Sequence, residues 1–485
     1  MIGGPRLKKP AEHVALTAAL LISVLVIAPV LYGYHVQTFS SAVAGGSRSY
    51  DLLGINSLVK FYVVGSIPSS VQRLFKSLGI QLTYIPLEEG LARATKLEDN
   101  SVVVINTRDA GLKPLNYYYV LTRLLDKASN YIIVLVNKDT KARDHLVLDA
   151  HASVFKVLSQ VYGKTYQPVI VCDPSDEALW QPREGEKPGG CRLHPAVVSA
   201  DAVAYYTRPP GTVIIENLDE NNAASVVIFV LKAYLPDSVF TRLAPLLPRD
   251  LVPSTSIKEG PSGMVPLGTV GWITNYTRGR VCGELTGYQS FYIRYYYGNF
   301  TSAIGTLYHV FYAYAVHSGK GYQTTCGRST INHYPRVFET VIHWKTDAYP
   351  GQVLDDWGKN VGSQRVITYT ISSGIGFSAT IEYSTGFTEP NAPYYTWMDL
   401  TDPYLGMVRV RHIVERGGWP EDRLNDVLFT VVPSSFGYLD PNKPYGYLPM
   451  VVYHSMYMEL NTGDSTNVTM AVLLWSNSYS WWITS

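Results

Sequence analysis

The sequence predicts a multidomain protein with an N-terminal transmembrane helix, a doubly wound parallel α/β domain and an all-β, sandwich-like domain. Three observations predict this fold class. An uncharged apolar run lies near the N-terminus, strand-like and helix-like patterns alternate after it, and from about residue 250 a hydrophobic period of two continues without helices between the strands. The chain of 485 residues is also longer than a single compact domain usually is.

Changes in composition along the chain predict its domain boundaries. The two folded domains are separated where Pro, Ser, Thr and Gly accumulate, because such a composition is typical of linkers. We expect a basic cytoplasmic segment at residues 1–12, a transmembrane signal anchor or signal peptide at 13–34, a linker at 35–57, an α/β Rossmann-like domain at 58–245, a Pro-rich linker at 246–268 and a Tyr-rich β-sandwich domain at 269–485.

The apolar run VALTAALLISVLVIAPVL at residues 14–31 is about as long as the shortest helix that spans a bilayer. Arg6, Lys8 and Lys9 precede it, and the next basic residue is Arg48. The positive-inside rule therefore predicts a single-pass protein of the cell membrane, with the N-terminus inside and the bulk of the chain extracellular. The lipid bilayer is then a partner of the N-terminal helix. The alternative is a signal peptide cleaved near Ala44, which would give a secreted protein.

The overall composition excludes some partners. Lys and Arg number 40 and Asp and Glu 39, so the net charge of +1 disfavours nucleic acid, which requires a basic face. Only 16% of the residues are charged, against roughly 25% in soluble domains. The 37 Tyr residues supply much of the polarity instead. This composition is typical of an exported protein that faces its surroundings.

The α/β domain is predicted from strand patterns that alternate with helical ones. The strands are near-continuous runs of β-branched residues, as buried parallel strands are. We expect strands at Val59–Gly65, Ile80–Pro86, Ser101–Asn106, Tyr131–Asn137, Pro168–Cys172, Ala202–Tyr206 and Val213–Glu216, and helices at Ser69–Leu78, Leu115–Ala128, His145–Tyr162 and Asn222–Leu235.

Part of this domain resembles a known family. The order VKFYVVG, SSVQRLFKSLGIQLTYIP, SVVVINTR and LNYYYVLTRLLDKASNYIIVLVN, over residues 58–140, is similar to glutamine-amidotransferase-like domains of the ThuA-like kind. The resemblance implies a doubly wound α/β fold. The catalytic Cys at a sharp turn, found in active members, has no counterpart, because Asn106 to Asp109 follow the third strand. The resemblance therefore implies a non-catalytic domain.

The second domain combines a period of two with abundant Tyr, whose ring packs on a pleated surface while its hydroxyl reaches water. This charge-poor, Tyr-rich composition resembles that of surface proteins from hyperthermophilic archaea. Strands without intervening helices predict a β-sandwich. We expect them at Tyr292–Tyr297, Leu307–Val316, Val337–Trp344, Met407–Ile413, Val427–Val432, Met450–Leu460 and Val468–Trp475.

One segment of the second domain, Ile367–Tyr383, alternates strictly. Its odd positions are mostly Ile, Tyr, Phe and Ala, and its even positions are Ser, Thr, Gly and one Glu. A β-hairpin that inserts into a membrane requires this alternation, because one face meets lipid and the other meets water. Two sandwich strands joined by a Gly-containing turn show the same pattern. Both interpretations remain open from the sequence.

Cysteines and sequons agree with export. Cys172, Cys191, Cys282 and Cys326 permit three pairings, and pairing neighbours along the chain would give one disulfide to each folded domain. N-x-S/T sequons begin at Asn275, Asn299 and Asn467, all in the second domain, and predict glycosylation.

Catalytic candidates are few. Asp355 and Asp356 beside Trp357, and Asp399 and Asp402 near other aromatic residues, have the composition of a glycosidase site with two carboxyl groups and sugar-stacking rings. The alternative is that these four carboxylates stabilise turns. The chain has no G-x-S-x-G, H-E-x-x-H or phosphate-loop motif, and we predict no metal site and no cofactor.

The sequence therefore favours a non-enzymatic role. We expect a membrane-anchored extracellular surface glycoprotein with a structural, adhesive or assembly function in an envelope or filament, whose partners are further copies of itself or other envelope proteins. The first alternative is an extracellular carbohydrate-active hydrolase. The second is a protein that forms pores by inserting a β-hairpin.

Overall fold

The structure is a computed structural model that describes two parts of the chain. In the first part the described residues are 60–64, 81–85, 101–106, 131–136, 170–172, 202–207, 210–216, 232 and 255–257. In the second part they are residues 260–475 apart from 279–284, 322, 327, 345, 348–350, 360–361, 426, 443–448 and 462–464. All statements below concern these residues.

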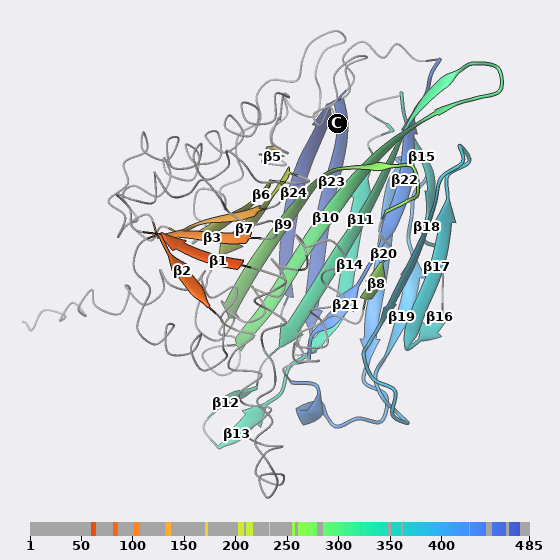
Figure 1. Ribbon diagram of the computed structural model, residues 1–485. Coiled ribbons are helices and arrows are strands. Elements are labelled where there is room, and N and C mark those ends of the chain that lie inside the picture. Colours follow the sequence, from red (N-terminus) through yellow and green to blue (C-terminus); the bar gives the residue numbers. More distant parts are fainter. Residues whose placement is uncertain are drawn as a thin grey trace, which may run out of the picture.

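The largest element is a mixed sheet of twelve strands (Figure 1). Its order is β15 (Gln352–Trp357), β22 (Ser434–Leu439), β11 (Leu307–Gly321), β10 (Leu285–Thr301), β9 (Val265–Arg278), β7 (Pro210–Glu216), β6 (Ala202–Thr207), β4 (Tyr131–Val136), β3 (Ser101–Asn106), β1 (Lys60–Val64) and β2 (Leu82–Tyr84), and β21 (Phe429–Val431) also pairs with β11. The sheet thus contains strands from both predicted domains.

This topology corrects the predicted fold class. Strands β2, β1, β3 and β4 are parallel as expected, but β6 is antiparallel to both β4 and β7. Strand β7 then pairs in parallel with β9, so the sheet continues into the predicted sandwich. The described residues therefore form no doubly wound, Rossmann-like domain. The prediction was wrong because a β-branched run indicates a buried strand without indicating the direction of its neighbour. Apart from Lys232, which is helical and lies in the predicted helix Asn222–Leu235, the residues of the four predicted helices lie outside the described ones.

A second sheet of seven strands lies behind the first in the view of Figure 1. Its order is β16 (Gly362–Gln364), β19 (Tyr394–Asp399), β20 (Met407–Glu415), β14 (Pro335–His343), β23 (Pro449–Leu460), β24 (Ser465–Trp475) and β5 (Ile170–Cys172). A third sheet contains β17 (Val366–Ser372), β18 (Ser378–Ser384) and β8 (Thr255–Ile257), and a short one pairs β12 (Thr324–Cys326) with β13 (Ser329–Ile331). The described elements are otherwise one 3₁₀ turn at Glu421–Arg423.

The two large sheets pack face to face around an aromatic core, as in a sandwich. The ring of His317 on β11 lies edge-on to Phe338 on β14, with centroids 4.9 Å apart. Trp344, just after β14, donates from its indole nitrogen to the hydroxyl of Ser435 on β22 at 2.9 Å. Strand β11 is buried at every residue from Val310 to Gly321, so both of its faces are covered. Burying one large apolar side chain contributes roughly 1.5–3 kcal/mol, and many such side chains are buried between the two sheets. The aromatic core is therefore a major source of stability for the sandwich.

The predicted localisation is also corrected. In the part of the chain that the structure describes, no helix is long and apolar enough to cross a membrane. The prediction of a single-pass anchor rested on one apolar run at the lower limit of length. That run at residues 13–34, and the cleavage position near Ala44, lie outside the described residues.

The predicted disulfides are likewise not found. Among the described side chains there is no disulfide, and none of the four cysteine side chains is placed there. Strand β5, which contains Cys172, pairs with β24 of the second sheet, so it does not belong to the sheet of its predicted domain.

Candidate functional site

The third sheet contains the alternating segment of the sequence as a hairpin. Strands β17 and β18 pair antiparallel, with Ile367 opposite Tyr383 and Thr370 opposite Thr380. Side chains along β17 are alternately exposed and buried, and the buried ones are the odd-numbered residues. The threonine hydroxyls of the Thr370–Thr380 pair are 2.9 Å apart on the exposed face. The hairpin therefore has one apolar face against the protein and one hydroxyl-rich face toward water.

A tight turn closes the hairpin at residues 373–377. The backbone nitrogen of Ser373 donates to the carbonyl of Phe377 at 2.7 Å, and that of Gly376 donates to the carbonyl of Ser373 at 3.1 Å. Gly376 has φ of +100°, a conformation that a side chain at this position would strain. The Gly-rich composition of this segment is thus explained by its turn.

Two of the predicted catalytic carboxylates hold this turn. One carboxylate oxygen of Asp355, on β15, accepts hydrogen bonds from the hydroxyl of Ser373 at 2.6 Å and from the backbone nitrogen of Gly374 at 3.1 Å. Asp356 accepts one from the backbone nitrogen of Ser372 at 2.9 Å. Its other oxygen pairs with Lys359 at 2.6 Å. Three consecutive residues of the hairpin are therefore attached to two consecutive aspartates of the large sheet, and we call this set of bonds the latch.

The other two candidates stabilise neighbouring loops. Asp399, at the end of β19, accepts hydrogen bonds from the indole nitrogen of Trp357 and from the backbone nitrogen of Thr401, both at 3.0 Å. Asp402 accepts two from the backbone nitrogens of Tyr404 and Leu405, at 3.0 and 3.2 Å. Each of the four carboxylates thus supports a turn or loop, which is the alternative that the sequence left open.

The latch changes the acidity of Asp355. Burial raises the pKa of this carboxyl, and the hydrogen bonds from Ser373 and Gly374 lower it, with a net upward shift. The protonated form is therefore favoured more in the docked hairpin than in a fully hydrated one. Acidification does not open the latch through Asp355, because protonation of this group favours the docked state.

The apolar face of the hairpin rests on both large sheets through two tyrosines, Tyr369 and Tyr383. The hydroxyl of Tyr369 donates to the carbonyl of Val432 at 2.6 Å and lies 2.9 Å from the hydroxyl of Ser434. The hydroxyl of Tyr383 lies 2.5 Å from Nε2 of His412 on β20. Both tyrosine rings also contact the ring of Trp397 on β19. This underside is an aromatic layer in which each tyrosine hydroxyl has a polar partner.

His412 is the group of this layer whose pKa lies far below that of a hydrated imidazole. Its side chain is fully buried and its ring stacks on Trp397, with centroids 5.3 Å apart. Burial, and secondarily the nearby His317, lower its pKa from 6.5 to about 3. The docked hairpin therefore requires a neutral imidazole beneath it.

The attachment of the hairpin differs from that of the other long strands. Within the described residues it pairs only with the three-residue strand β8, and β17 is the outer strand of this small sheet. No backbone ladder connects the described hairpin to either large sheet. Side chains and the latch hold it in place, so it can separate from the sandwich without breaking the large sheets.

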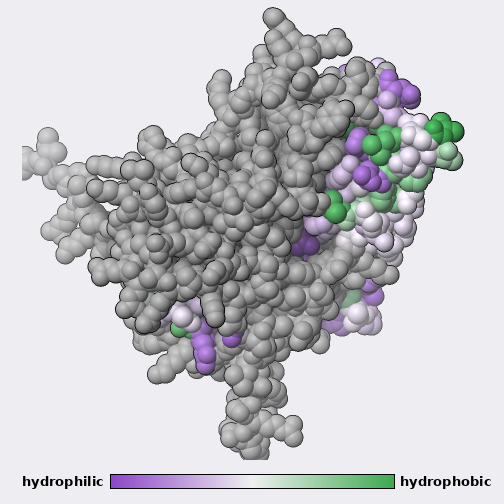
Figure 2. Space-filling view, turned by 45° about the horizontal axis from the view of Figure 1, so that its top comes forward, coloured by the Kyte–Doolittle hydropathy of each residue, from purple (hydrophilic) through white to green (hydrophobic). Residues whose placement is uncertain are grey.

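The turn of the hairpin lies beside the tip of the long β10–β11 hairpin. Phe300 approaches Gly376, and Phe377 approaches Gly298. Apolar side chains are exposed at this tip: Ile304 is 88% exposed, and Phe300, Leu307 and Val265 also face solvent. Apolar residues are visible on this part of the described surface in Figure 2. Two uncharged, partly apolar turns therefore lie together at one end of the molecule.

The predicted glycosylation positions are placed in part. Asn299 lies on β10, next to the tip, and is exposed. The side chains of Asn275 and Asn467 lie outside the described residues. Glycosylation at Asn299 is sterically open and stays a prediction.

A prediction about the latch follows from its geometry. Replacing Asp355 with Ala removes the oxygen that accepts both hydrogen bonds from the turn, whereas Asp355→Asn retains a carbonyl oxygen in the same place. Hydrogen bonds to a charged group contribute about 1.5–3 kcal/mol, and Asp355 is partly exposed, so we expect amide exchange at Ser373 and Gly374 to accelerate about tenfold in Asp355→Ala. Asp355→Asn should stay close to the parent protein. Hydrogen exchange measured by mass spectrometry checks both, and equal exchange in all three proteins would contradict the latch.

Comparisons with known proteins identify no family for this chain. No family model matches the chain, and no curated protein matches it. Among solved structures, the chain is similar to the NetB toxin of Clostridium perfringens in its membrane-inserted form, with 7% sequence identity and a TM-score of 0.17. The match covers 43% of this chain and 94% of that one. A likeness at this TM-score does not establish a common fold.

Sequence reasoning missed the partners of the hairpin. The pattern of Ile367–Tyr383 predicts the buried face correctly, but it does not say which surface covers that face. The sequence does contain a signal that His412 is buried, because it shares the buried face of β20 with Val408, Val410 and Val414. The bonds between Asp355 and Ser373 connect segments with no local sequence relation, so no pattern could predict them.

Proposed function

We propose that this protein forms pores, and that it does so by releasing the β17–β18 hairpin from the sandwich and inserting it into a lipid bilayer with hairpins of further copies. The observation that carries the proposal is a two-faced hairpin that is docked through side chains and a latch. Its apolar face is buried against the body, and its hydroxyl-rich face is exposed. Once released, the same two faces suit lipid on one side and water on the other.

The length of the hairpin supports the proposal. Each strand has seven residues, which extend over about 24 Å. The apolar band of strands that cross a membrane is about 25 Å tall. Strands that cross a membrane are tilted and need about 9–11 residues, so each arm reaches across the band when the adjoining turn residues extend it. Tyr383, near the base, would lie at the interface, where aromatic residues are enriched.

A single hairpin is not stable in lipid, because its outer backbone groups would have no partners. Several copies must therefore pair edge to edge until the ring of strands closes. Strand β17 is already the outer strand of its sheet, so its outer edge is available for such pairing once the hairpin leaves the body. Self-association is consequently part of the proposed function.

Dye release from liposomes tests the proposal. The full chain is added to liposomes loaded with a self-quenched dye, and we expect release. Ile371→Lys combined with Ala379→Lys places charges on a cross-strand pair of the lipid-facing side, where each costs up to about 2–4 kcal/mol, and should abolish release. The matched control, Thr370→Lys combined with Thr380→Lys, places the same charges on the water-facing side and should retain it.

Thermal unfolding of both double variants shows whether they fold. Absence of release by the folded parent protein, at any pH between 4 and 8 and with any lipid composition tried, would overturn the proposal. Equal release by the two double variants would also contradict the assignment of the faces.

A second candidate is a structural or adhesive role at a surface. The exposed Asn299 sequon supports it, since a glycan there would extend from the end of the sandwich. Assembly of the folded protein into filaments, without any dye release, would favour this role. The hydrolase alternative receives no such support, because the four candidate carboxylates serve the turns and loops described above.

A further inference from the structure

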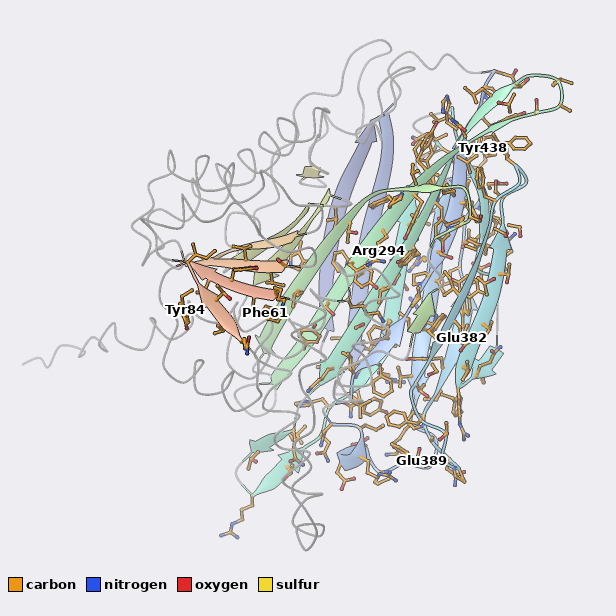
Figure 3. The ribbon with its side chains drawn as sticks, viewed as in Figure 1. Phe61, Tyr84, Arg294, Glu382, Glu389 and Tyr438 are labelled. Atoms are coloured by element: carbon orange, nitrogen blue, oxygen red, sulfur yellow. The ribbon has the colours of Figure 1, made fainter. Side chains whose placement is uncertain are left out.

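The exposed face of the hairpin carries one charged side chain. Every other residue of this face is uncharged, and most have hydroxyl groups. The face consists of Val366, Thr368, Thr370, Ser372, Ser378, Thr380, Glu382 and Ser384. Between Val366 and Ser384, Glu382 is also the single charged residue of the sequence. It is labelled on β18 in Figure 3.

The surroundings of Glu382 leave its carboxylate in contact with water. It lies opposite Thr368, whose hydroxyl donates to it over a long distance of 3.5 Å, and opposite Ser256 of β8 on its other side. Its side chain is exposed, and no ion pair with a Lys or Arg is seen for it among the described residues. Burial of the apolar face does not require a charge at this position. The carboxylate therefore contributes no contact to the docked state beyond this weak hydrogen bond.

We infer that Glu382 lines the pore and makes it select cations over anions, an inference that rests on the proposed function. Side chains of a strand alternate between its two faces, so Glu382 must face the water-filled interior when Ile381 and Tyr383 face lipid. Each copy supplies one carboxylate at the same height. Rings of Asp or Glu side chains attract cations and exclude anions in channels of this kind.

The height of this ring follows from the register of the hairpin. Glu382 pairs with Thr368, which is close to the base of the hairpin and far from the turn at Ser373–Phe377. If the turn crosses the bilayer first, the carboxylate ring lies at the mouth nearest the folded body. The remainder of the interior is lined by Ser and Thr hydroxyls, which carry no charge. Charge selection is therefore concentrated at one level of the pore.

Reversal potentials in planar bilayers test the inference. With the full chain and a KCl gradient, the parent protein should pass K⁺ in preference to Cl⁻. Glu382→Gln should lower the K⁺/Cl⁻ permeability ratio to about one, and Glu382→Lys should bring it below one. The matched control is Glu389→Gln, because Glu389 is an exposed glutamate beyond the base of the hairpin, outside the alternating segment (Figure 3). The K⁺/Cl⁻ permeability ratio of Glu389→Gln should equal that of the parent.

The outcomes separate the inference from the proposed function. Conductance with no cation preference in the parent, or with a preference that Glu382→Gln leaves unchanged, overturns the inference and leaves the pore intact. Absence of conductance in the parent and in every variant overturns the proposed function, and the inference with it. A ratio that changes equally in Glu382→Gln and Glu389→Gln assigns selection to overall charge and also overturns the inference.

Discussion

A covalent link between the hairpin and β15 should abolish dye release completely. The variant that combines Asp355→Cys with Ser373→Cys places thiols on two side chains that are now joined by a 2.6 Å hydrogen bond. Cys is shorter than Asp, so the turn must move slightly toward β15 for the Cβ separation of about 3.5–4.5 Å that a disulfide requires. Once oxidised, the turn cannot leave the sandwich, so insertion is blocked. Reduction should restore release to at least the parent level, because the substitutions also remove the latch. Dye release with and without reductant measures this effect.

The controls for this experiment are the two single-cysteine variants and the parent under the same reductant. They are needed because the chain has four cysteines of its own, whose redox state could affect release independently. Formation of the intended link is verified by peptide mapping. Full release by the verified, oxidised double variant would show that the hairpin need not move, and would contradict the proposed mechanism.

Acidification should increase dye release, and His412 should account for most of the increase. The pKa of His412 is about 3 beneath the docked hairpin, against 6.5 for a hydrated imidazole. Its contribution to docking is complete above pH 6.5 and decreases as the pH falls toward 3, because protonation then favours the released state. At about 1.4 kcal/mol per pKa unit, the full loss is at most about 5 kcal/mol. Release rates at pH 7.5, 6, 5 and 4 measure it.

The groups that face His412 do not reverse this sign. Tyr383 and Tyr395 are neutral at these pH values, and His317 on β11 is a second buried imidazole whose pKa is about 3. Asp355, at the turn, has the opposite sign, since burial raises its pKa and protonation favours docking. A net increase on acidification is therefore attributed to the imidazole.

Two substitutions test this attribution. His412→Gln removes the titrating group and should flatten the pH profile between 6.5 and 4. His317→Gln is the matched control, because His317 bonds to Gln289 and Thr340 within the sandwich and makes no described contact with the hairpin. It should keep most of the parent's slope, because burial lowers the pKa of His412 more than His317 does. A slope that survives in His412→Gln and disappears in His317→Gln would assign acid sensitivity to the core of the sandwich and refute this prediction.

The sequence predicts strands well where β-branched residues are continuous. Ser101–Asn106 is a strand both in the prediction and in the structure, and the predicted strand Tyr131–Asn137 is one residue longer than β4. The prediction from sequence fails where the pairing of a strand depends on a partner far along the chain. The antiparallel return of β6 and the pairing of β5 with β24 depend on the path of the connections, which a local period does not encode.

The candidate site shows the same division. Alternation in Ile367–Tyr383 predicts a hairpin with one covered face, and the structure confirms which face is covered. The same pattern cannot distinguish a permanent sandwich layer from a releasable one. The proposal that the hairpin is released rests instead on the separate small sheet and on the bonds of Asp355 and Asp356, neither of which a local pattern encodes.

The ladder between β7 and β9 has a consequence for how the protein can be divided. Six residue pairs join these strands across the Pro-rich segment that we predicted as a linker. Cutting the chain there would leave the inner edge of β9 with unpaired backbone groups over much of its length. Such an edge recruits other strands, and fragments of this kind aggregate. The pairing of β7 with β9 therefore couples the two halves of the chain, and we expect the β-rich half expressed alone to polymerise.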